Sequence, residues 1–411
     1  MRRGEAIDTG RLRQLLRTMP VPGAAEAERR GLALVEAAFA EREGAAELRR
    51  PSLPQLAIAL AITTLIAALL LSPAGAAVRD WIGDVFEPGV ENAEPALTRI
   101  PGGGRLAVSS PAGPWVVQPD GSRRLLGHYR EATWSPHGLY LAAAAGRTLT
   151  AVEPDGDPHW SIAAAAPVTD PRWSPSGYRI AYRAGRQLRV VDADGEAHTR
   201  LRAAAAAIAP SWSPQGVPDL AYVDAKGRLT IAEANSGVRI ASAPTLQGID
   251  KIEWGADQEL LEASATSVRL RPIVLEKLAS GVRLGQARSV SLPGSGHVAD
   301  AALSPDGSKL AVLRQFGGVA QARAEVDLVA VRSGTVRRLW RTPGHLGEIV
   351  WSPDSSRLLL TWPQADQWLF VPVEGRARVR AVADISRQFA PGTPAAAFPT
   401  VSGWCCPPNQ P

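Results

Sequence analysis

A short motif recurs along most of this chain, and it restricts the fold more than any other feature. The tripeptide Trp-Ser-Pro, or a degenerate form of it, begins at intervals of 39 to 49 residues at Trp134, Trp173, Trp212, Trp254, Leu303 and Trp351. A short apolar run with the composition of a β-strand follows each copy. A period of 40 to 50 residues that holds several short strands is typical of the blades of a β-propeller.

The chemistry of the repeat explains its residues. Pro fixes φ in the turn after the anchor residue, and the Gly that follows in several copies accepts a positive φ. The large anchor side chain is expected to pack between adjacent blades. This expectation accounts for most of the twelve Trp in the sequence. The predicted packing residues are Trp134, Trp173, Trp212, Trp254, Leu303, Trp351 and Trp404.

A second turn in each repeat gives the number of blades. Seven such second turns end at Gly121, Gly156, Gly195, Gly237, Gly281, Gly334 and Gly375, whereas only six anchors lie between Trp134 and Trp351. The opening repeat, near Leu106, has no anchor strand before it. Residues 398–404 have the form of an anchor strand with nothing after it, so this strand is expected to complete the first blade and close the ring. We predict an all-β, seven-bladed propeller over residues 101–404, with six or eight blades as alternatives.

The repeats also resemble a known family. The [Trp/Leu]-Ser-Pro-Asp-Gly pattern, present as Leu303 to Gly307, is similar to the WD40-like (PD40) repeats of TolB and related bacterial proteins. The chain contains no Trp-Asp dipeptide, so true WD40 repeats are disfavoured. The whole layout looks like that of membrane-anchored bacterial propellers. The resemblance implies a binding protein rather than a particular reaction.

An apolar segment precedes the repeats. Residues 51–78 contain no charged side chain, and residues 54–78 are long enough to cross about 30 Å of hydrocarbon as a helix. Arg42, Arg49 and Arg50 precede this segment, while mostly acidic residues follow it. The positive-inside rule then predicts a single-pass cell-membrane protein with a cytoplasmic N-terminus and an extracytoplasmic propeller. A cleaved signal peptide ending near Ala76 is the alternative.

Residues 1–53 are predicted to form two short helices in the cytoplasm, and residues 79–100 form a linker to the propeller. The helices carry apolar stripes that include Leu12, Leu15, Leu16, Leu34, Val35 and Phe39. One interpretation is a solvated or membrane-surface tail. The other is a hairpin that binds a cytoplasmic protein, since the layout resembles that of membrane-tethered anti-sigma factors. The segment lacks the His and Cys residues of the zinc-binding members of that class.

Reactive motifs are absent from the sequence. There is no G-x-S-x-G nucleophile elbow, no H-E-x-x-H and no calcium-loop pattern. The six His are scattered, and Asp155, Asp194, Asp306 and Asp354 fall in turns, where Asp bonds its own backbone. A net charge of +5 over 411 residues gives little support to nucleic-acid binding. We therefore expect no catalytic, cofactor-binding or metal-binding residues.

The two Cys are adjacent, at Cys405 and Cys406, in the predicted tail 405–411. A free or half-buried pair, a vicinal disulfide and a bridge to a partner are all compatible with the sequence. The most direct functional hypothesis is a membrane-anchored scaffold or sensor. Its propeller would bind an unknown protein or envelope ligand, and residues 1–53 would bind a cytoplasmic partner such as a sigma factor. A propeller enzyme of the hydrolase or lactonase type, with polar residues in its channel, is the alternative. A passive scaffold without a working cytoplasmic part is a third.

Overall fold

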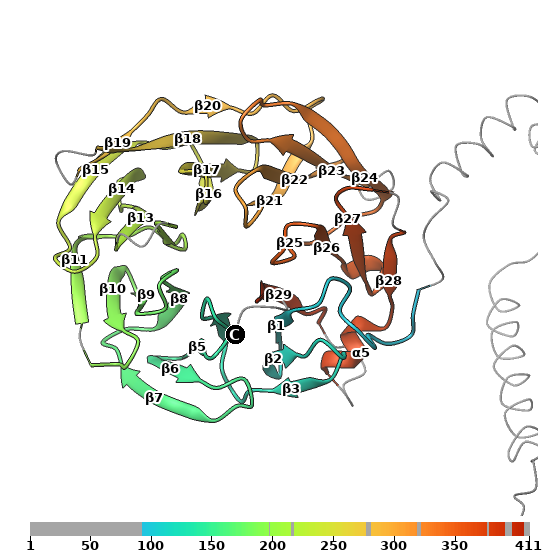
Figure 1. The fold of residues 1–411 in the computed structure, drawn as a ribbon, viewed down its shortest axis with the longest axis horizontal. Coiled ribbons are helices and arrows are strands. Elements are labelled where there is room, and N and C mark those ends of the chain that lie inside the picture. The colour runs from blue at the N-terminus through green and yellow to red at the C-terminus, as the bar shows by residue number, and fades with distance from the viewer. Residues whose placement is uncertain are drawn as a thin grey trace, which may run out of the picture. The chain divides into compact units, whose positions relative to one another are not determined.

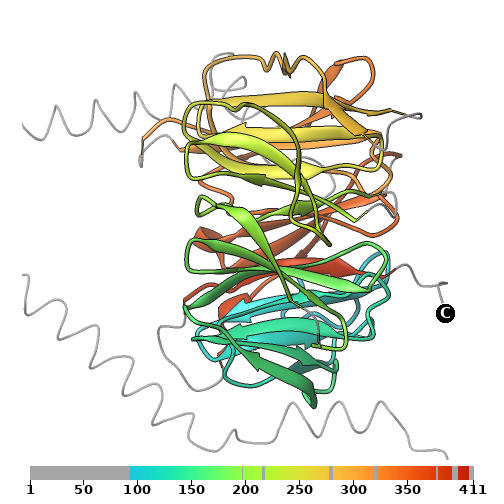
Figure 2. The same ribbon diagram turned by 90° about the vertical axis from the view of Figure 1, so that its left-hand side faces the viewer.

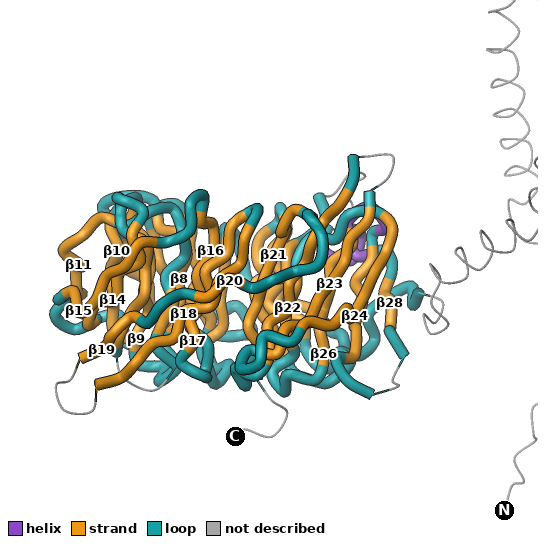
Figure 3. Tube along the Cα trace, turned by 90° about the horizontal axis from the view of Figure 1, so that it is seen from above, coloured by secondary structure: helices purple, strands orange, loops and turns teal. Residues whose placement is uncertain are grey.

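The computed structural model describes residues 93–196, 198–214, 218–276, 281–318, 322–375, 378–390 and 397–406. These residues form seven antiparallel sheets arranged in a ring (Figure 1). Figures 2 and 3 show the ring from its edge, with turns gathered at its two faces. The prediction of seven blades is therefore confirmed. Residues 1–53, the predicted span 54–78 and most of the linker lie outside the described residues.

The innermost strand of each blade is the one that carries the anchor residue, and in five blades the sheet runs outward in plain chain order. Blade 2 contains β4 (Glu131–Trp134), β5 (Leu141–Ala145), β6 (Thr148–Val152) and β7 (Pro158–Ala163). Blade 3 contains β8 (Val168–Trp173), β9 (Arg179–Ala184), β10 (Gln187–Asp192) and β11 (His198–Ala204). Blade 4 contains β12 (Ser211–Trp212), β13 (Asp219–Val223), β14 (Arg228–Glu233) and β15 (Arg239–Pro244).

Blade 6 contains β21 (His297–Leu303), β22 (Lys309–Phe316), β23 (Arg323–Ala330) and β24 (Val336–Pro343). Blade 7 contains β25 (Ile349–Trp351), β26 (Arg357–Trp362), β27 (Gln367–Pro372) and β28 (Arg380–Val382), with the 3-10 turn η2 (Pro363–Ala365) between β26 and β27. The short helix α5 (Ile385–Phe389) follows β28.

Blade 5 departs from the regular pattern. It contains β16 (Ile249–Trp254), β17 (Glu259–Ser264), the long β18 (Ser267–Glu276) and β19 (Gly281–Leu284). β19 pairs with the second half of β18, and β20 (Arg288–Ser289) pairs with its first half. The fourth position of this blade is thus shared by two short strands. This is the stretch where the sequence repeat is least regular.

Blade 1 is built from both ends of the propeller. Its order is β29 (Thr400–Cys405), β1 (Arg105–Ser110), β2 (Gly113–Val117) and β3 (Arg123–Leu125). β29 pairs with β1 so that Trp404 lies opposite Leu106, and the register shifts once, between Ala107 and Val108. The prediction that the C-terminal strand closes the ring is confirmed. The closure also leaves no unpaired inner edge on β1.

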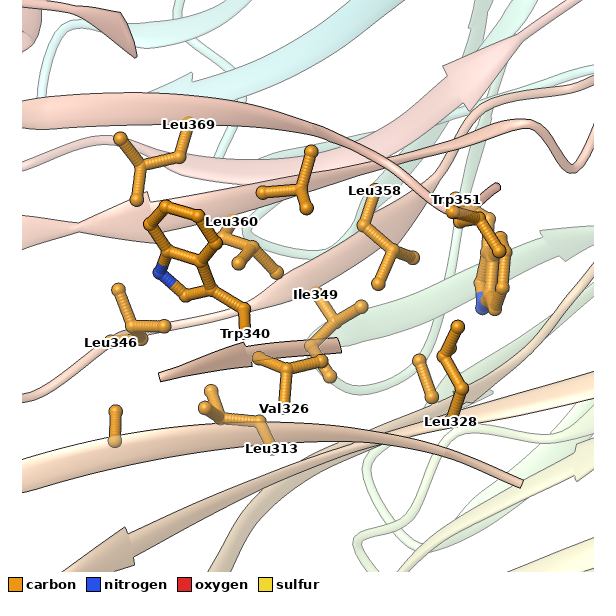
Figure 4. Packing of buried hydrophobic residues seen from close by; sticks show 14 of the residues in the cluster. Leu313, Val326, Leu328, Trp340, Leu346, Ile349, Trp351, Leu358, Leu360 and Leu369 are labelled. Carbon is orange, nitrogen blue, oxygen red and sulfur yellow. The ribbon is translucent and has the colours of Figure 1, made fainter. Parts of the chain in front are cut away.

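The core is divided among the spaces between blades. Figure 4 shows the cluster between blades 6 and 7, where Val326 and Leu328 of β23 approach Leu358 and Leu360 of β26. Trp351 belongs to the same cluster. Similar clusters join each blade to the preceding one around the ring. Each sheet therefore buries both faces, which is why its central strands read as nearly continuous apolar runs.

The repeat motif forms a turn that is locked by its serine. The Ser174 Oγ accepts the backbone N–H of Arg179 at 3.1 Å, and the Ser352 Oγ accepts that of Arg357 at 2.9 Å. In blade 3 the Gly177 N–H returns to the Ser174 carbonyl at 2.9 Å, with φ of 75° at the glycine. The side chain at Ser and the positive φ at Gly together allow the tight reversal between the first two strands.

Candidate functional site: the central channel and its mouth

The innermost strands enclose a cavity of about 880 Å³ along the axis of the ring. Strands of all seven blades line it, because each blade presents its first strand to the axis. Its charged lining residues are Glu131, Arg172, Asp250, Lys251, Glu253, Asp300 and Glu348. Carboxylates therefore outnumber basic groups in this part of the described structure. None of these residues lies in a recognisable sequence motif.

The anchor residues lie between blades. Trp212 packs with Leu188 and Val190 of blade 3, and Trp254 packs with Ala221 of blade 4. The Trp212 and Trp351 indole N–H groups donate to carbonyls of the preceding blade, those of Arg172 and Ala302, at 2.8 and 2.9 Å. All seven predicted packing residues belong to clusters that span two blades: Trp134, Trp173, Trp212, Trp254, Leu303, Trp351 and Trp404.

Polar side chains on the same strands face the other way. Because side chains alternate along a strand, residues one and three positions before the anchor share the face opposite to it. The Glu131 carboxylate accepts the Asp170 N–H of the next blade at 3.0 Å. The Glu253 carboxylate accepts the Leu303 N–H at 3.1 Å.

The pattern continues around the ring. The Asp300 carboxylate accepts the Ile349 N–H at 2.9 Å, and the Glu348 carboxylate accepts the Val401 N–H at 2.8 Å. Ser211 plays the same part in blade 4, where its Oγ accepts the Trp254 N–H at 2.8 Å. Thus one face of each of these inner strands packs on the preceding blade through an anchor, and the other bonds the following blade through a polar group.

One cation pairs with this set of acceptors. The Lys251 ammonium lies 2.8 Å from the Asp300 carboxylate, although 37% of the lysine side chain is open to the channel. Burial within the channel walls lowers the pKa of Lys251, but Asp300 and Glu253 outweigh that effect, so the pKa is raised overall. Lys251 therefore stays charged at neutral pH and offsets part of the negative charge of the channel.

The pKa values of three glutamates in the channel are raised. Burial raises the pKa of Glu131 and of Glu253, although backbone hydrogen bonds and nearby cations lower it in part. Burial raises the pKa of Glu348 to about 7, with Asp300 adding to the effect while the Val401 N–H and Lys251 oppose it. The pKa of the Glu348 carboxyl therefore lies close to neutral pH.

A periodic signal in the sequence marks these residues. The position three before the anchor holds Glu131, Asp170, Lys251, Asp300 and Glu348 in blades 2, 3, 5, 6 and 7. A charged residue at a fixed offset inside a strand-like run is unusual for a buried strand. Aligning the repeats on the anchor would have found it, whereas a search for catalytic motifs passed over it.

The described residues contain no group of three or more His, Cys, Asp or Glu side chains placed to hold a metal ion. His159 lies against the Tyr140 ring, with 5.0 Å between ring centroids, and His345 Nδ1 lies 3.0 Å from the Gln315 amide oxygen. The turn carboxylates bond their own backbone. For example, Asp194 accepts the Glu196 N–H at 3.0 Å and Asp354 accepts the Ser356 N–H at 3.0 Å.

The two cysteines form a vicinal disulfide at the end of β29. It lies beside the turn of blade 2, where a Cβ added at Gly138 would approach Cys406 Sγ to 2.3 Å. Arg105 of β1 donates to the Gly138 carbonyl at 2.7 Å and stacks over the Trp134 ring, 4.8 Å from its centroid. The junction between blades 1 and 2 therefore combines the disulfide, a cation–π contact and a hydrogen bond.

Similarity to one known structure supports the fold. The β-propeller domain of Myceliophteria thermophila Cps50 (Swd1) aligns with a TM-score of 0.51 at 19% identity, covering 66% of this chain and 94% of that one. Kuenenia stuttgartiensis hydrazine synthase aligns with a TM-score of 0.46 at 17% identity, covering 59% of this chain and 75% of that one. No protein-family model and no curated protein matches the sequence. The chain is a seven-bladed β-propeller.

Within the described residues, no helix is long and apolar enough to span a bilayer. The predicted span at residues 54–78 lies outside that part of the chain, as do Leu12, Leu15, Leu16, Leu34, Val35 and Phe39, the predicted partner face of the N-terminal helices.

Proposed function

We propose that this chain is a TolB-like propeller, anchored in the membrane by one helix, that binds a protein or envelope ligand outside the cytoplasm as a scaffold or sensor. The observation that supports a binding function rather than an enzymatic one is that the channel carboxylates are engaged in hydrogen bonds between blades. Glu131, Glu253, Asp300 and Glu348 each accept a backbone N–H of the following blade. Groups committed to holding the ring together are poorly placed to act as general acids or bases, which must reach a reacting atom.

The proposal of a binding protein rather than an enzyme has a direct test. A photo-crosslinking amino acid is placed in the anchored full-length chain, in intact cells, at one exposed turn of each blade in separate experiments. We expect specific adducts from one or a few neighbouring blades, since propellers bind partners through loops that converge on one face. If no position gives an adduct above that of an unirradiated sample, the binding function is wrong.

The proposed topology rests on the apolar residues 54–78, with Arg42, Arg49 and Arg50 before them. Protease added to intact cells should digest the propeller down to its resistant core and spare an epitope tag at the N-terminus. Permeabilised cells should lose the tag as well. Removal of the tag while the propeller stays intact would contradict the proposed orientation and indicate the opposite one.

We also propose that residues 1–53 transmit a signal to a cytoplasmic protein, with a sigma factor as the candidate partner. The support is the apolar stripe that includes Leu34 and Phe39. Affinity purification of the full-length chain in mild detergent is compared with the Leu34→Asp/Phe39→Asp variant. A sigma factor retained by the wild type and lost by the variant supports signalling. Equal recovery from both leaves a scaffold without a cytoplasmic function.

A further inference from the structure

Two adjacent blades expose apolar side chains in their first turns. Leu139 in blade 2 and Tyr178 in blade 3 are 65% and 74% exposed, the highest values among the large apolar residues that the structure describes. Both follow the Gly of the repeat turn, so they occupy the same position in their repeats. The corresponding residues of blades 6 and 7 are Ser308 and Ser356. The two apolar residues are therefore not required by the turn itself.

The two turns form one continuous surface. A Cβ added at Gly177 of blade 3 would lie 3.6 Å from Pro136 Cγ and 3.9 Å from His137 Cδ2 of blade 2. We call the surface formed by Pro136, Leu139, Pro175 and Tyr178 the blade 2–3 surface. Burying an exposed Leu or aromatic side chain is favourable, so a partner that covers both gains a substantial part of its affinity.

The second turns of the same two blades are acidic. Residues 153–157 contain Glu153, Asp155 and Asp157, residues 192–196 contain Asp192, Asp194 and Glu196, and neither segment contains Lys or Arg. Asp155, Asp157, Asp194 and Glu196 are exposed. By contrast, the corresponding turn of blade 1 is followed by two Arg and that of blade 6 contains one, in a chain whose net charge is +5.

The acidic turns adjoin the apolar residues. The Ala193 N–H donates to the Tyr178 carbonyl at 2.9 Å, which fixes the acidic turn of blade 3 beside Tyr178. In blade 2 the ring of Tyr140, next to Leu139, contacts His159, which follows the acidic turn. Asp192 pairs with Arg179, at 3.8 Å, and Asp155 lines a surface pocket beside Arg123 and Arg124 of blade 1. Asp157, Asp194 and Glu196 are exposed and can meet a partner.

We propose that the blade 2–3 surface binds a basic segment of a partner protein that inserts an aliphatic or aromatic side chain between Leu139 and Tyr178 and places Arg or Lys beside the acidic turns. This inference rests on the proposed binding function and names its surface and partner chemistry. Charge complementarity selects this occupant, because clustered carboxylates attract cationic groups and repel nucleic acid and anionic lipid.

A selection experiment tests the inference. The purified full-length chain in detergent is used to select from a library of random peptides displayed on phage, followed by affinity measurement of the recovered peptides. We expect peptides with at least two basic residues and one large apolar residue. Their Kd should rise at least tenfold in the Leu139→Ser/Tyr178→Ser variant, which carries the residue found in blades 6 and 7. A similar loss is expected at high salt, since screening weakens exposed charge pairs.

A matched pair of variants isolates the charge. Asp194→Asn removes one exposed carboxylate from the acidic turn of blade 3, and Glu374→Gln removes one from the equivalent turn of blade 7, where its side chain is 72% exposed. Peptide affinity should fall in the first variant and stay unchanged in the second. Far-ultraviolet circular dichroism and melting temperature check that each variant is folded.

Three results would overturn the inference. Recovered peptides that bind the double Ser variant equally well would leave the binding function intact and place it on another surface. Peptides without basic residues would contradict the partner chemistry. Sedimentation that shows a wild-type dimer and a monomeric double Ser variant would identify a second copy of the chain as the occupant.

Discussion

The Glu348 carboxylate of blade 7 accepts a hydrogen bond from the Val401 N–H of β29, 2.8 Å away, and so ties the last regular blade to the strand that closes the ring. The two residues are separated by 53 positions in the sequence. This contact is the last of a series in which polar groups on inner strands bond the following blade. The closure of the ring therefore involves a hydrogen bond to a titratable group.

This contact predicts a pH dependence of stability. Burial raises the pKa of Glu348 from 4.5 to about 7, so the folded chain holds this proton over a range in which the unfolded chain has lost it. Stability from this group is fully present below about pH 4.5 and is lost as the pH rises through about 7. Denaturant titrations give the free energy of unfolding at pH 5 and at pH 8. Between these pH values the free energy of unfolding of Glu348→Gln should rise relative to that of the wild type by on the order of 2 kcal/mol. An equal difference in the free energy of unfolding at both pH values would contradict the raised pKa of Glu348.

Removal of β29 should open the ring. A chain that ends at residue 397 leaves β1 with an unpaired edge and exposes Leu106 and Val108, both fully buried in the closed ring. We expect a melting temperature lower by 10 °C or more, or aggregation of the chain. A chain that ends at residue 406 keeps β29 and is the control. Similar melting of both chains in calorimetry would show that the closure contributes little.

Trp351 should be a major contributor to packing between blades 6 and 7. It is 5% exposed and its indole donates to the Ala302 carbonyl at 2.9 Å. Trp351→Ala should lower the free energy of unfolding by about 3–5 kcal/mol. Trp351→Phe keeps most of the apolar volume and should cost less. Leu139→Ala, at an exposed turn, serves as the control and should change stability by less than about 0.5 kcal/mol.

Blade 6 contains a buried ion network that should respond asymmetrically to substitution. Arg314 and Asp327 are 1% and 0% exposed and are hydrogen-bonded to each other, and Arg338 also bonds Asp327, at 3.1 Å. Asp327→Leu alone leaves the Arg314 charge buried without this partner, so it should cost about 3–5 kcal/mol. Arg314→Met/Asp327→Leu should be less destabilising than that single change. A double variant that is less stable than both the Asp327→Leu and the Arg314→Met single variants would contradict this account.

The disulfide between Cys405 and Cys406 predicts the thiol content of the protein. Thiol titration in denaturant should detect no free thiol in the isolated chain and two after reduction. Cys405→Ser should show one free thiol without reduction. A disulfide-linked dimer on a non-reducing gel would instead support a bridge between two chains.

The repeat chemistry of the sequence predicted the architecture well. Trp134, Trp173 and Trp212 recur at a spacing that one four-stranded blade requires, and the surplus of second turns over anchors required a strand from the far end. Both features are local, so they can be counted along the chain. The channel was missed, because Glu131 or Asp300 looks like an ordinary surface charge until its strand is known to be the innermost of a blade.

The blade 2–3 surface illustrates the same limit. Leu139 and Tyr178 are 39 positions apart, and the sequence gives no indication that their turns are in contact. Leu139 and Tyr178 can be assigned to a binding surface only because they are exposed, since the same residues turned inward would belong to the core.

The amino-acid sequence by itself determined the form of one blade, the number of blades and the origin of the closing strand, because each depends on the order and spacing of residues along the chain. The tertiary structure alone decided which side chains face the channel, which bond the next blade and which stay on the rim. These contacts depend on how separate repeats are brought together around the ring. The residue pattern of one repeat does not specify where the side chains of the neighbouring repeats lie.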